Sequence, residues 1–301
     1  MSRFRIKKYI GYLFILCLFI GFGGRTTVNA TNGSTASPYS NQVININGDL
    51  YGGGTIDASN ENLGDINGKT FNNNTITVSG SLNGGGIVGA SYSHTIGDII
   101  NCSFTNNVIT ASKIAGGGIL GASSGDLFSN INVGLGSFGN ISNSQFTGNT
   151  ITANATTSYY YDEFGHLYQT GSAIIRGGIV YSANDLTISD SQFTNNNITS
   201  TNGIVYGGAV TMDTAIFIDR SAAGNADANT SRLTIIASPG HETIFQNNKV
   251  KDESGERYNS ITFQSVRKDY NPLSKTNAIL DIKAAGTVSL YDPIYVRQTN
   301  D

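Results

Sequence analysis

Residues 104–120, FTNNVITASKIAGGGIL, contain the two motifs around which this 301-residue chain is organised. The first motif is FxxN, which recurs as FNNN at 71–74, FTNN at 104–107, FTGN at 146–149, FTNN at 193–196 and FQNN at 245–248. The second is a glycine pair, which begins at Gly52, Gly84, Gly116, Gly177 and Gly207. Two motifs that alternate along most of a chain predict a repeat architecture.

The spacing of the motifs shows where the repeat is interrupted. Gly84 and Gly116 are 32 residues apart, which sets the length of the basic unit. Longer intervals elsewhere predict insertions near residues 123–137, 154–171 and 213–233. Insertions in repeat proteins map to loops, often on the face that binds a partner.

Short alternating apolar runs between the motifs predict strands. In the clearest unit, residues 99–104, 108–110 and 119–120 are expected to form three strands, with a turn at Asn106 and Asn107 because asparagine tolerates the left-handed conformation. Three strands and three turns in about 32 residues are typical of one coil of a β-solenoid. We therefore expect an all-β chain that forms a parallel β-helix of about eight coils.

Stacked coils explain both motifs without any chemistry. Apolar side chains at equivalent positions would form buried ladders, and asparagine amides could hydrogen bond from coil to coil. Glycine would permit positive φ and close backbone approach. The residues assigned this structural role are Phe71, Asn74, Phe104, Asn107, Phe146, Asn149, Phe193, Asn196, Phe245 and Asn248.

The N-terminus has the pattern of a secretory signal. Basic residues precede an apolar run from position 9 to 22, and Val28-Asn29-Ala30 offers small residues for cleavage, so we expect a signal peptide at 1–30 and a flexible leader at 31–42. The run is short for a membrane anchor, which is the alternative, and we expect no membrane span in the mature chain.

Charge and cysteine content narrow the possible partners of the mature chain. Removal of residues 1–30 takes away five basic and no acidic residues and leaves 13 basic against 21 acidic ones. This balance argues against nucleic acid or an anionic membrane surface as a partner. Only Cys102 remains, so an internal disulfide is excluded.

The alternating motifs resemble the passenger repeats of the polymorphic membrane protein family of autotransporter adhesins. The resemblance covers about residues 52–248, where the motifs stand as GGGI, GGGI, GGIV and GGAV among the five FxxN copies. It implies a right-handed coil, export as a passenger, and adhesion at the surface of a Gram-negative bacterium. The family ends in a membrane β-barrel, for which residues 43–301 leave no room. We therefore expect either a truncated passenger or a freely secreted relative.

The composition changes after the last FxxN motif. Residues 249–275 contain ten charged residues of both signs, which predicts a solvated loop. Strand alternation resumes at 278–282 and 288–291, so the β-helix is expected to continue to the terminus with its last coil uncapped.

An enzyme is the alternative, because β-helices also carry polysaccharide lyases and hydrolases. Carboxylates do not recur at the coil period, and His94, His166 and His241 lack metal-ligand spacing. We expect no catalytic residues, no metal and no cofactor.

The insertion at 154–171 has the composition of a binding loop. It contains Tyr159, Tyr160, Tyr161, Phe164 and Tyr168, and aromatic side chains with polar tips suit protein or glycan recognition. The other interpretation is that these aromatic rings cover the flank of the β-helix.

The leading hypothesis for the function of the chain is a secreted adhesin-like rod that presents loops to a host or neighbouring-cell protein or glycan. A non-functional fragment of a disrupted gene is a third possibility.

Overall fold

The computed structural model describes residues 39–91, 93–122, 136–156, 158–161, 167–170, 172–213, 230–266 and 277–299. The fold is all-β: every regular element in these residues is a β-strand, and the four large sheets are built from parallel pairs apart from one antiparallel edge strand. The expected signal peptide and residues 31–38 of the expected leader lie outside this part of the chain.

Two sheets carry the strands around the FxxN motif, and each is named here after its first strand. The β1 sheet contains β1 (Val43–Ile46), β5 (Thr75–Val78), β11 (Val108–Ala111), β17 (Thr150–Ala153), β23 (Asn197–Ser200), β27 (Lys249–Asp252) and the antiparallel β28 (Gly255–Tyr258). The β4 sheet contains β4 (Thr70–Asn72), β10 (Ser103–Thr105), β16 (Gln145–Thr147), β22 (Gln192–Thr194), β26 (Glu242–Gln246) and β31 (Thr287–Leu290).

Two further sheets complete each pass of the chain. The β2 sheet contains β2 (Ile56–Ala58), β7 (Val88–Ala90), β13 (Leu120–Ala122), β20 (Val180–Ser182), β24 (Val210–Asp213), β29 (Ile261–Val266) and β32 (Ile294–Thr299). The β3 sheet contains β3 (Ile66–Asn67), β9 (Ile99–Ile100), β15 (Ile141–Ser142), β21 (Leu186–Ser189), β25 (Thr230–Ala237) and β30 (Asn277–Ala284). Short pairs join β6 (Ser81–Leu82) to β12 (Lys113–Ile114) and β8 (Thr95–Ile96) to β14 (Ser137–Phe138).

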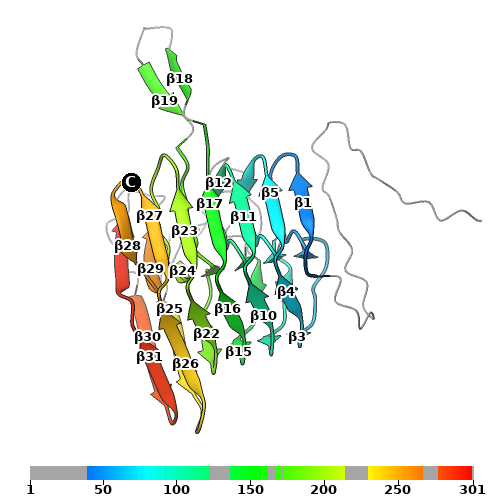
Figure 1. Cartoon of the computed structure of the whole chain (residues 1–301), viewed down its shortest axis with the longest axis vertical. Coiled ribbons are helices and arrows are strands. Elements are labelled where there is room, and N and C mark those ends of the chain that lie inside the picture. Colours follow the sequence, from blue (N-terminus) through cyan, green and yellow to red (C-terminus); the bar gives the residue numbers. More distant parts are fainter. Residues whose placement is uncertain are drawn as a thin grey trace, which may run out of the picture.

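The chain visits the sheets in the same order on successive passes. From β9 to β13, for example, it runs through the β3, β4, β1 and β2 sheets, and each strand pairs in parallel with its counterpart in the next pass. Figure 1 shows the strands of the β1 sheet side by side in chain order, from blue to orange. This arrangement is compatible with a parallel β-helix.

A column of phenylalanines runs through the interior. Each FxxN phenylalanine pairs in register with the next one, and all five side chains are fully buried. The four distances between successive ring centroids are 4.7, 4.7, 4.7 and 4.9 Å, and the planes of neighbouring rings are within 9° of parallel. The ring spacing therefore equals the strand spacing of a parallel sheet.

The FxxN asparagines form a second buried column. Asn107 shows the pattern: its Nδ2 donates to Asn149 Oδ1 at 2.9 Å and to the Phe71 carbonyl at 2.7 Å. Its Oδ1 accepts from the backbone N–H and from Nδ2 of Asn74. The side-chain amide is therefore bonded both to the pass before it and to the pass after it.

The motif glycines allow close backbone approach. A Cβ atom at Gly116 would lie 2.1 Å from the Gly84 carbonyl oxygen, and one at Gly177 would lie 1.9 Å from that of Gly116. None of the five first glycines of the motif has φ in the left-handed region. The expectation of positive φ at this motif was wrong, and the expectation of close approach is confirmed.

Positive φ occurs instead at two asparagine-rich corners. Asn106 has φ of 55°, which confirms the predicted turn, and the equivalent residues Asn73, Gly148, Asn195 and Asn247 share this conformation. A second corner at Asn101, with φ of 53°, separates β9 from β10. The prediction of one strand over 99–104 was therefore wrong, because the left-handed residue turns the chain into the next sheet.

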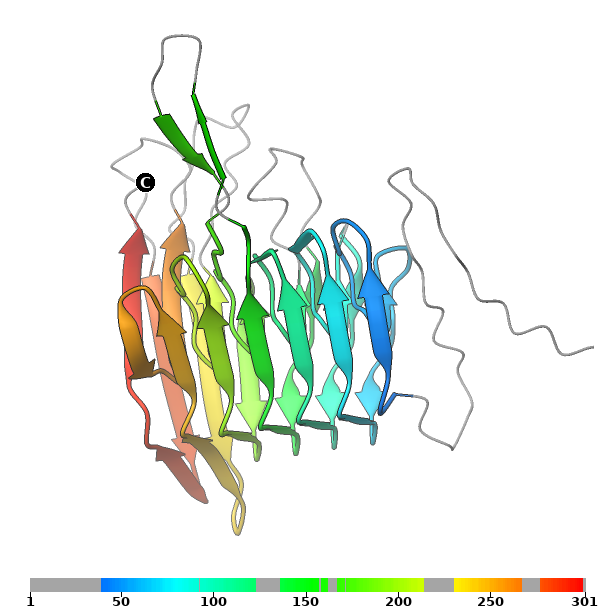
Figure 2. The same cartoon turned by 45° about the horizontal axis from the view of Figure 1, so that its top comes forward.

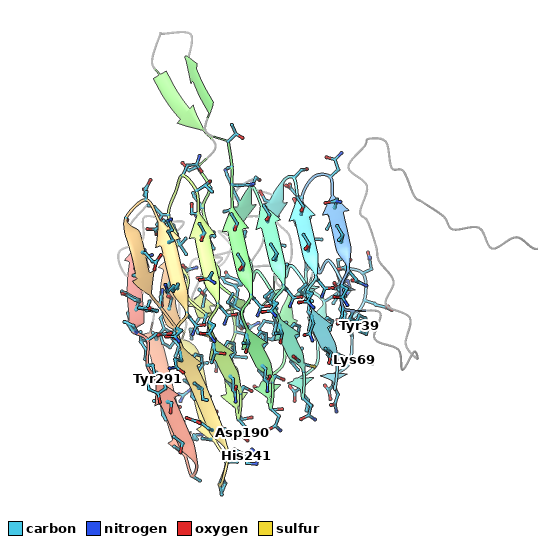
Figure 3. The ribbon with its side chains drawn as sticks, viewed as in Figure 1. Tyr39, Lys69, Asp190, His241 and Tyr291 are labelled. Carbon is cyan, nitrogen blue, oxygen red and sulfur yellow. The ribbon has the colours of Figure 1, made fainter. Side chains whose placement is uncertain are left out.

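The two ends of the stack differ in what covers them; Figure 3 labels Tyr39 near the first end and Tyr291 near the last. At the first pass, the Tyr39 ring packs 5.2 Å from that of Phe71, and Lys69 Nζ lies 5.8 Å from the Tyr39 ring. Residues 39–42, which the sequence analysis assigned to the leader, thus contact the body of the fold. At the other end, Asp292 accepts hydrogen bonds from the backbone N–H and Nδ2 of Asn248 and ends the asparagine column.

The final edge is only partly covered. The strand β28 turns back on β27, so part of residues 249–275, expected as a loop, forms a hairpin. In the other three large sheets β30, β31 and β32 stand last. Ile282 and Val296 on this edge are 49% and 75% exposed.

We predict that Asn149→Ala lowers the free energy of unfolding by about 3 kcal/mol or more. It removes the acceptor of two Asn107 donors and the donor to the Phe104 carbonyl, and each buried polar group left unpaired costs about 1–3 kcal/mol. Urea denaturation followed by circular dichroism measures the change. The control is Asn197→Ala at an exposed strand position, which should stay within about 0.5 kcal/mol of the unmodified chain. Equal effects of the two variants would contradict a structural role for the column.

Candidate functional site

A β-hairpin projects from the stack between β17 and β20. It consists of β18 (Ser158–Tyr161) and β19 (Leu167–Thr170), which pair antiparallel. Figures 1 and 2 show this hairpin standing away from the sheets, on the side toward which the strands of the β1 sheet point. It is the predicted insertion at 154–171.

The hairpin contains most of the aromatic residues singled out in the sequence. Tyr159, Tyr160 and Tyr161 lie on β18, and Tyr168 lies on β19 directly opposite Tyr160. Phe164 falls outside the described residues. The structure therefore brings four of the five predicted residues into one two-stranded element.

The insertion does not disturb the stacking of the pass that carries it. Before the hairpin, Ala155 N–H donates to the Ser112 carbonyl at 3.1 Å. After it, Ile175 forms bridges with Ile114 in the preceding pass and with Val205 in the following one. The chain thus leaves the stack, forms the hairpin and returns in register.

Asn202, in the following pass, ties the two legs of the hairpin together at their base. Its Nδ2 donates to the Ala155 carbonyl at 2.8 Å, and its Oδ1 accepts from the Ala173 N–H at 3.2 Å. Ser200 Oγ also donates to the Ala173 carbonyl. Asn202 was not predicted from the sequence, because its partners lie 29 and 47 residues away and no local pattern marks it.

The other predicted insertions begin along one edge of the β2 sheet. One follows Ala122 at the end of β13, and another follows Asp213 at the end of β24. Residues 123–135 and 214–229 themselves lie outside the described part of the chain. Because the strands of this sheet are parallel, their carboxyl ends lie along one edge, and so do these two starting points.

A buried polar group lies where the second of these insertions begins. Asp213 is fully buried and accepts hydrogen bonds from Tyr181 Oη at 2.7 Å and from Gln264 Nε2 at 3.2 Å. This buried group was not predicted from the sequence. The sequence did contain a signal: the glycine motif is followed by Gly89 and Gly121 in the earlier passes but by Tyr181 here. These three residues stand in register. The bulky residue marks a pass that is built differently from the earlier two.

A buried carboxylate with an arginine partner belongs to Asp252 in the β27–β28 hairpin. Both of its oxygens accept from Arg257, each at 3.0 Å, and they also accept from the N–H groups of Val205 and Ser254. Burial acts to raise the pKa of Asp252, but these hydrogen bonds outweigh it, so the pKa lies below its usual value. Arg257 also donates to the Val205 carbonyl, so the pair fastens this hairpin to the preceding pass.

Cys102 is buried within a column of hydroxyl side chains. Its backbone N–H donates to Ser144 Oγ, and the Ser144 N–H donates in turn to Ser191 Oγ. Burial raises the pKa of the Cys102 thiol, and backbone hydrogen bonds oppose this only in part. A protonated, buried thiol is unsuited to nucleophilic chemistry.

Nothing in the described geometry assembles a metal centre. Within the described ranges, no three His, Cys, Asp or Glu side chains lie close enough together to hold an ion. The same part of the chain contains no helix long and apolar enough to span a membrane.

Comparisons with family models, curated proteins and solved structures found no match to this chain.

We predict that Asp252→Asn destabilises the fold more at neutral pH than in acid. Because the folded-state pKa is depressed, the carboxylate contributes stability above about pH 4 that is lost as the pH falls through the folded value. Removing one partner of a buried pair costs about 3–5 kcal/mol, and the partly exposed Arg257 favours the lower end. Urea midpoints at pH 7 and pH 3 measure the effect.

The matched control uses the exposed Lys249–Glu256 pair of the same hairpin. Glu256→Gln should hardly move the midpoint at either pH, since exposed ion pairs contribute little. A difference between Asp252→Asn and the unmodified chain that persists unchanged at pH 3 would show that the carboxylate charge is not responsible.

Proposed function

We propose that this chain is a secreted or surface-exposed adhesin-like rod that presents loops to a partner without catalysis. The passes described above would form a right-handed parallel β-helix. The family resemblance supports this handedness, together with export as a passenger of a Gram-negative bacterium. The partner would be a protein or glycan on a host or neighbouring cell.

The observation that carries this proposal is the β18–β19 hairpin. A rod held together by in-register columns can carry a projecting element without loss of its own contacts. The bridges of Ile175 to Ile114 in the preceding pass and to Val205 in the following pass illustrate this. A hairpin rich in tyrosine offers large contact areas with polar tips at low entropic cost. The clamp at Asn202 supports a role that needs a defined hairpin position.

The alternative is a polysaccharide-active enzyme. The observation that would favour it is Asp213, a fully buried carboxylate that accepts a hydrogen bond from Tyr181 at the start of an insertion. Incubation with pectin and other uronate polymers, followed by ultraviolet absorbance of unsaturated products and by a reducing-end assay, tests this alternative. Turnover lost in Asp213→Asn would replace the adhesin proposal.

We predict that replacing Tyr159, Tyr160 and Tyr161 by serine reduces cell binding at least about tenfold. Loss of two aromatic contacts of roughly 1 kcal/mol each already exceeds the 1.4 kcal/mol that corresponds to a tenfold change. Binding of the fluorescently labelled secreted chain to host cells, bacterial cells and a glycan array is measured by flow cytometry and array fluorescence.

The control for this experiment is Thr187→Ser on β21, outside the hairpin. It should leave binding unchanged, and both variants should keep the thermal unfolding midpoint of the unmodified chain. Asn202→Ala should weaken binding less than the triple substitution, because it loosens the base and keeps the rings. Undiminished binding by the triple variant would exclude the hairpin as the binding element.

A further inference from the structure

The outward face of the β1 sheet carries two in-register columns of uncharged residues, in which six of eight are threonine. The first column contains Thr75, Val108, Thr150 and Asn197, and the second contains Thr77, Thr110, Thr152 and Thr199. Each residue in a column pairs in register with the next, so the side chains stand above one another across four neighbouring strands. All eight are exposed or partly exposed.

A buried isoleucine column holds this face from behind. Ile76, Ile109, Ile151 and Ile198 alternate with the outward residues and are at most 1% exposed. The four strands run side by side in Figure 1, with little change of direction between neighbours. Threonine is β-branched and restricted in χ1, so the outward hydroxyl and methyl groups are held on a rigid base.

The threonine hydroxyls of this face can hydrogen bond to an external ligand. Within the described residues, no protein group hydrogen bonds to the six threonine side chains of the two columns. The adjacent β4 sheet differs, because Thr147 Oγ1 bonds Thr194 Oγ1 at 3.1 Å and Ser103 Oγ bonds Thr105 Oγ1 at 3.0 Å. Internal pairing is thus possible between such residues and is absent from the β1 face.

The chemistry of the face narrows the class of ligand. None of the eight residues is charged, and the first charged residues along these columns are Lys249 and Lys251 on β27. Phosphates and lipid headgroups need cationic partners, and none is present among the eight. The eight also include no aromatic ring, which a sugar surface would use for stacking.

Strand geometry sets two repeat distances for the outward side chains of this face. Neighbouring strands of a sheet are about 4.8 Å apart, and alternate residues along a strand are about 6.7 Å apart. These two repeats are close to the distances between equivalent oxygens in surface planes of hexagonal ice. A hydroxyl can both donate to and accept from such oxygens, while the methyl group beside it orders the intervening water.

We propose that the threonine face of β5, β11, β17 and β23 binds the surface of ice crystals. Binding occurs by many weak hydrogen bonds at once, so it depends on the flatness and continuity of the array rather than on any one residue. This activity is separate from partner binding by the β18–β19 hairpin, which lies outside the array.

The test is the incorporation of the fluorescently labelled secreted chain into a slowly grown ice hemisphere. We expect the unmodified chain to be enriched in the ice and to shape single crystals below their melting point. Thr110→Tyr places a ring in the centre of the array while keeping a good strand former. It should reduce the ice-bound fraction several-fold and abolish crystal shaping.

The matched control is Thr187→Tyr, which adds the same ring to β21 in the β3 sheet. It should retain the behaviour of the unmodified chain, and thermal unfolding should show that both variants are folded. Exclusion of the unmodified chain from ice would overturn the proposal, as would equal incorporation of the two variants. Retention on cellulose or chitin that Thr110→Tyr abolishes, without enrichment in ice, would assign the face to a neutral glycan instead.

Discussion

The structure depends on the buried asparagine column, in which each side-chain amide bonds simultaneously to the pass before it and to the pass after it. An amide in this position tolerates only one register, because a shift by one residue would leave its donors and acceptors without partners in the interior. The stacked phenylalanines add apolar burial at the same spacing. One sequence motif thus supplies both the register and a large part of the core.

This constraint explains why the chain accepts insertions of such different length. The asparagine column forms whenever the asparagine of each pass lies at the same place in the stack. The number of residues between one asparagine and the next does not matter for this. Asn107 and Asn149 are 42 residues apart, and Asn196 and Asn248 are 52 apart, yet both pairs bond in the same way. The β18–β19 hairpin, between β17 and β20, is an insertion of this kind.

Much of the architecture could be predicted because the repeated residues act on copies of themselves. The counterparts of Phe104 and Asn107 stand at the same place in five successive passes, so the spacing of the motif predicted the parallel strands and the insertions. The division at Asn101 was missed because a left-handed asparagine within an apolar run leaves no distinct signal. The statement that carboxylates do not recur at the coil period was wrong: Asp65 and Asp98, 33 residues apart, each follow a glycine and accept from a backbone N–H of the next pass, at 2.8 and 2.7 Å.

The candidate sites were less predictable than the scaffold. The composition of the loop at 154–171 drew attention to its tyrosines, but the base clamp at Asn202 arises from contacts between distant segments. The threonine face has a similar origin. A single threonine in β5 or β11 does not predict an ordered array of hydroxyls. Only the register between strands places Thr77, Thr110 and Thr152 in one column.

The in-register stacking of the passes is the central claim, and thiol bridging tests it most directly. In a Cys102→Ser background, cysteines at Thr110 and Thr152 should be bridged by dibromobimane, which fluoresces only when it joins two thiols, because these residues pair directly on β11 and β17. Cysteines at Thr110 and Thr199, two strands apart, should remain unbridged. Equal fluorescence from the two pairs, or none from the first, would contradict the stacked register.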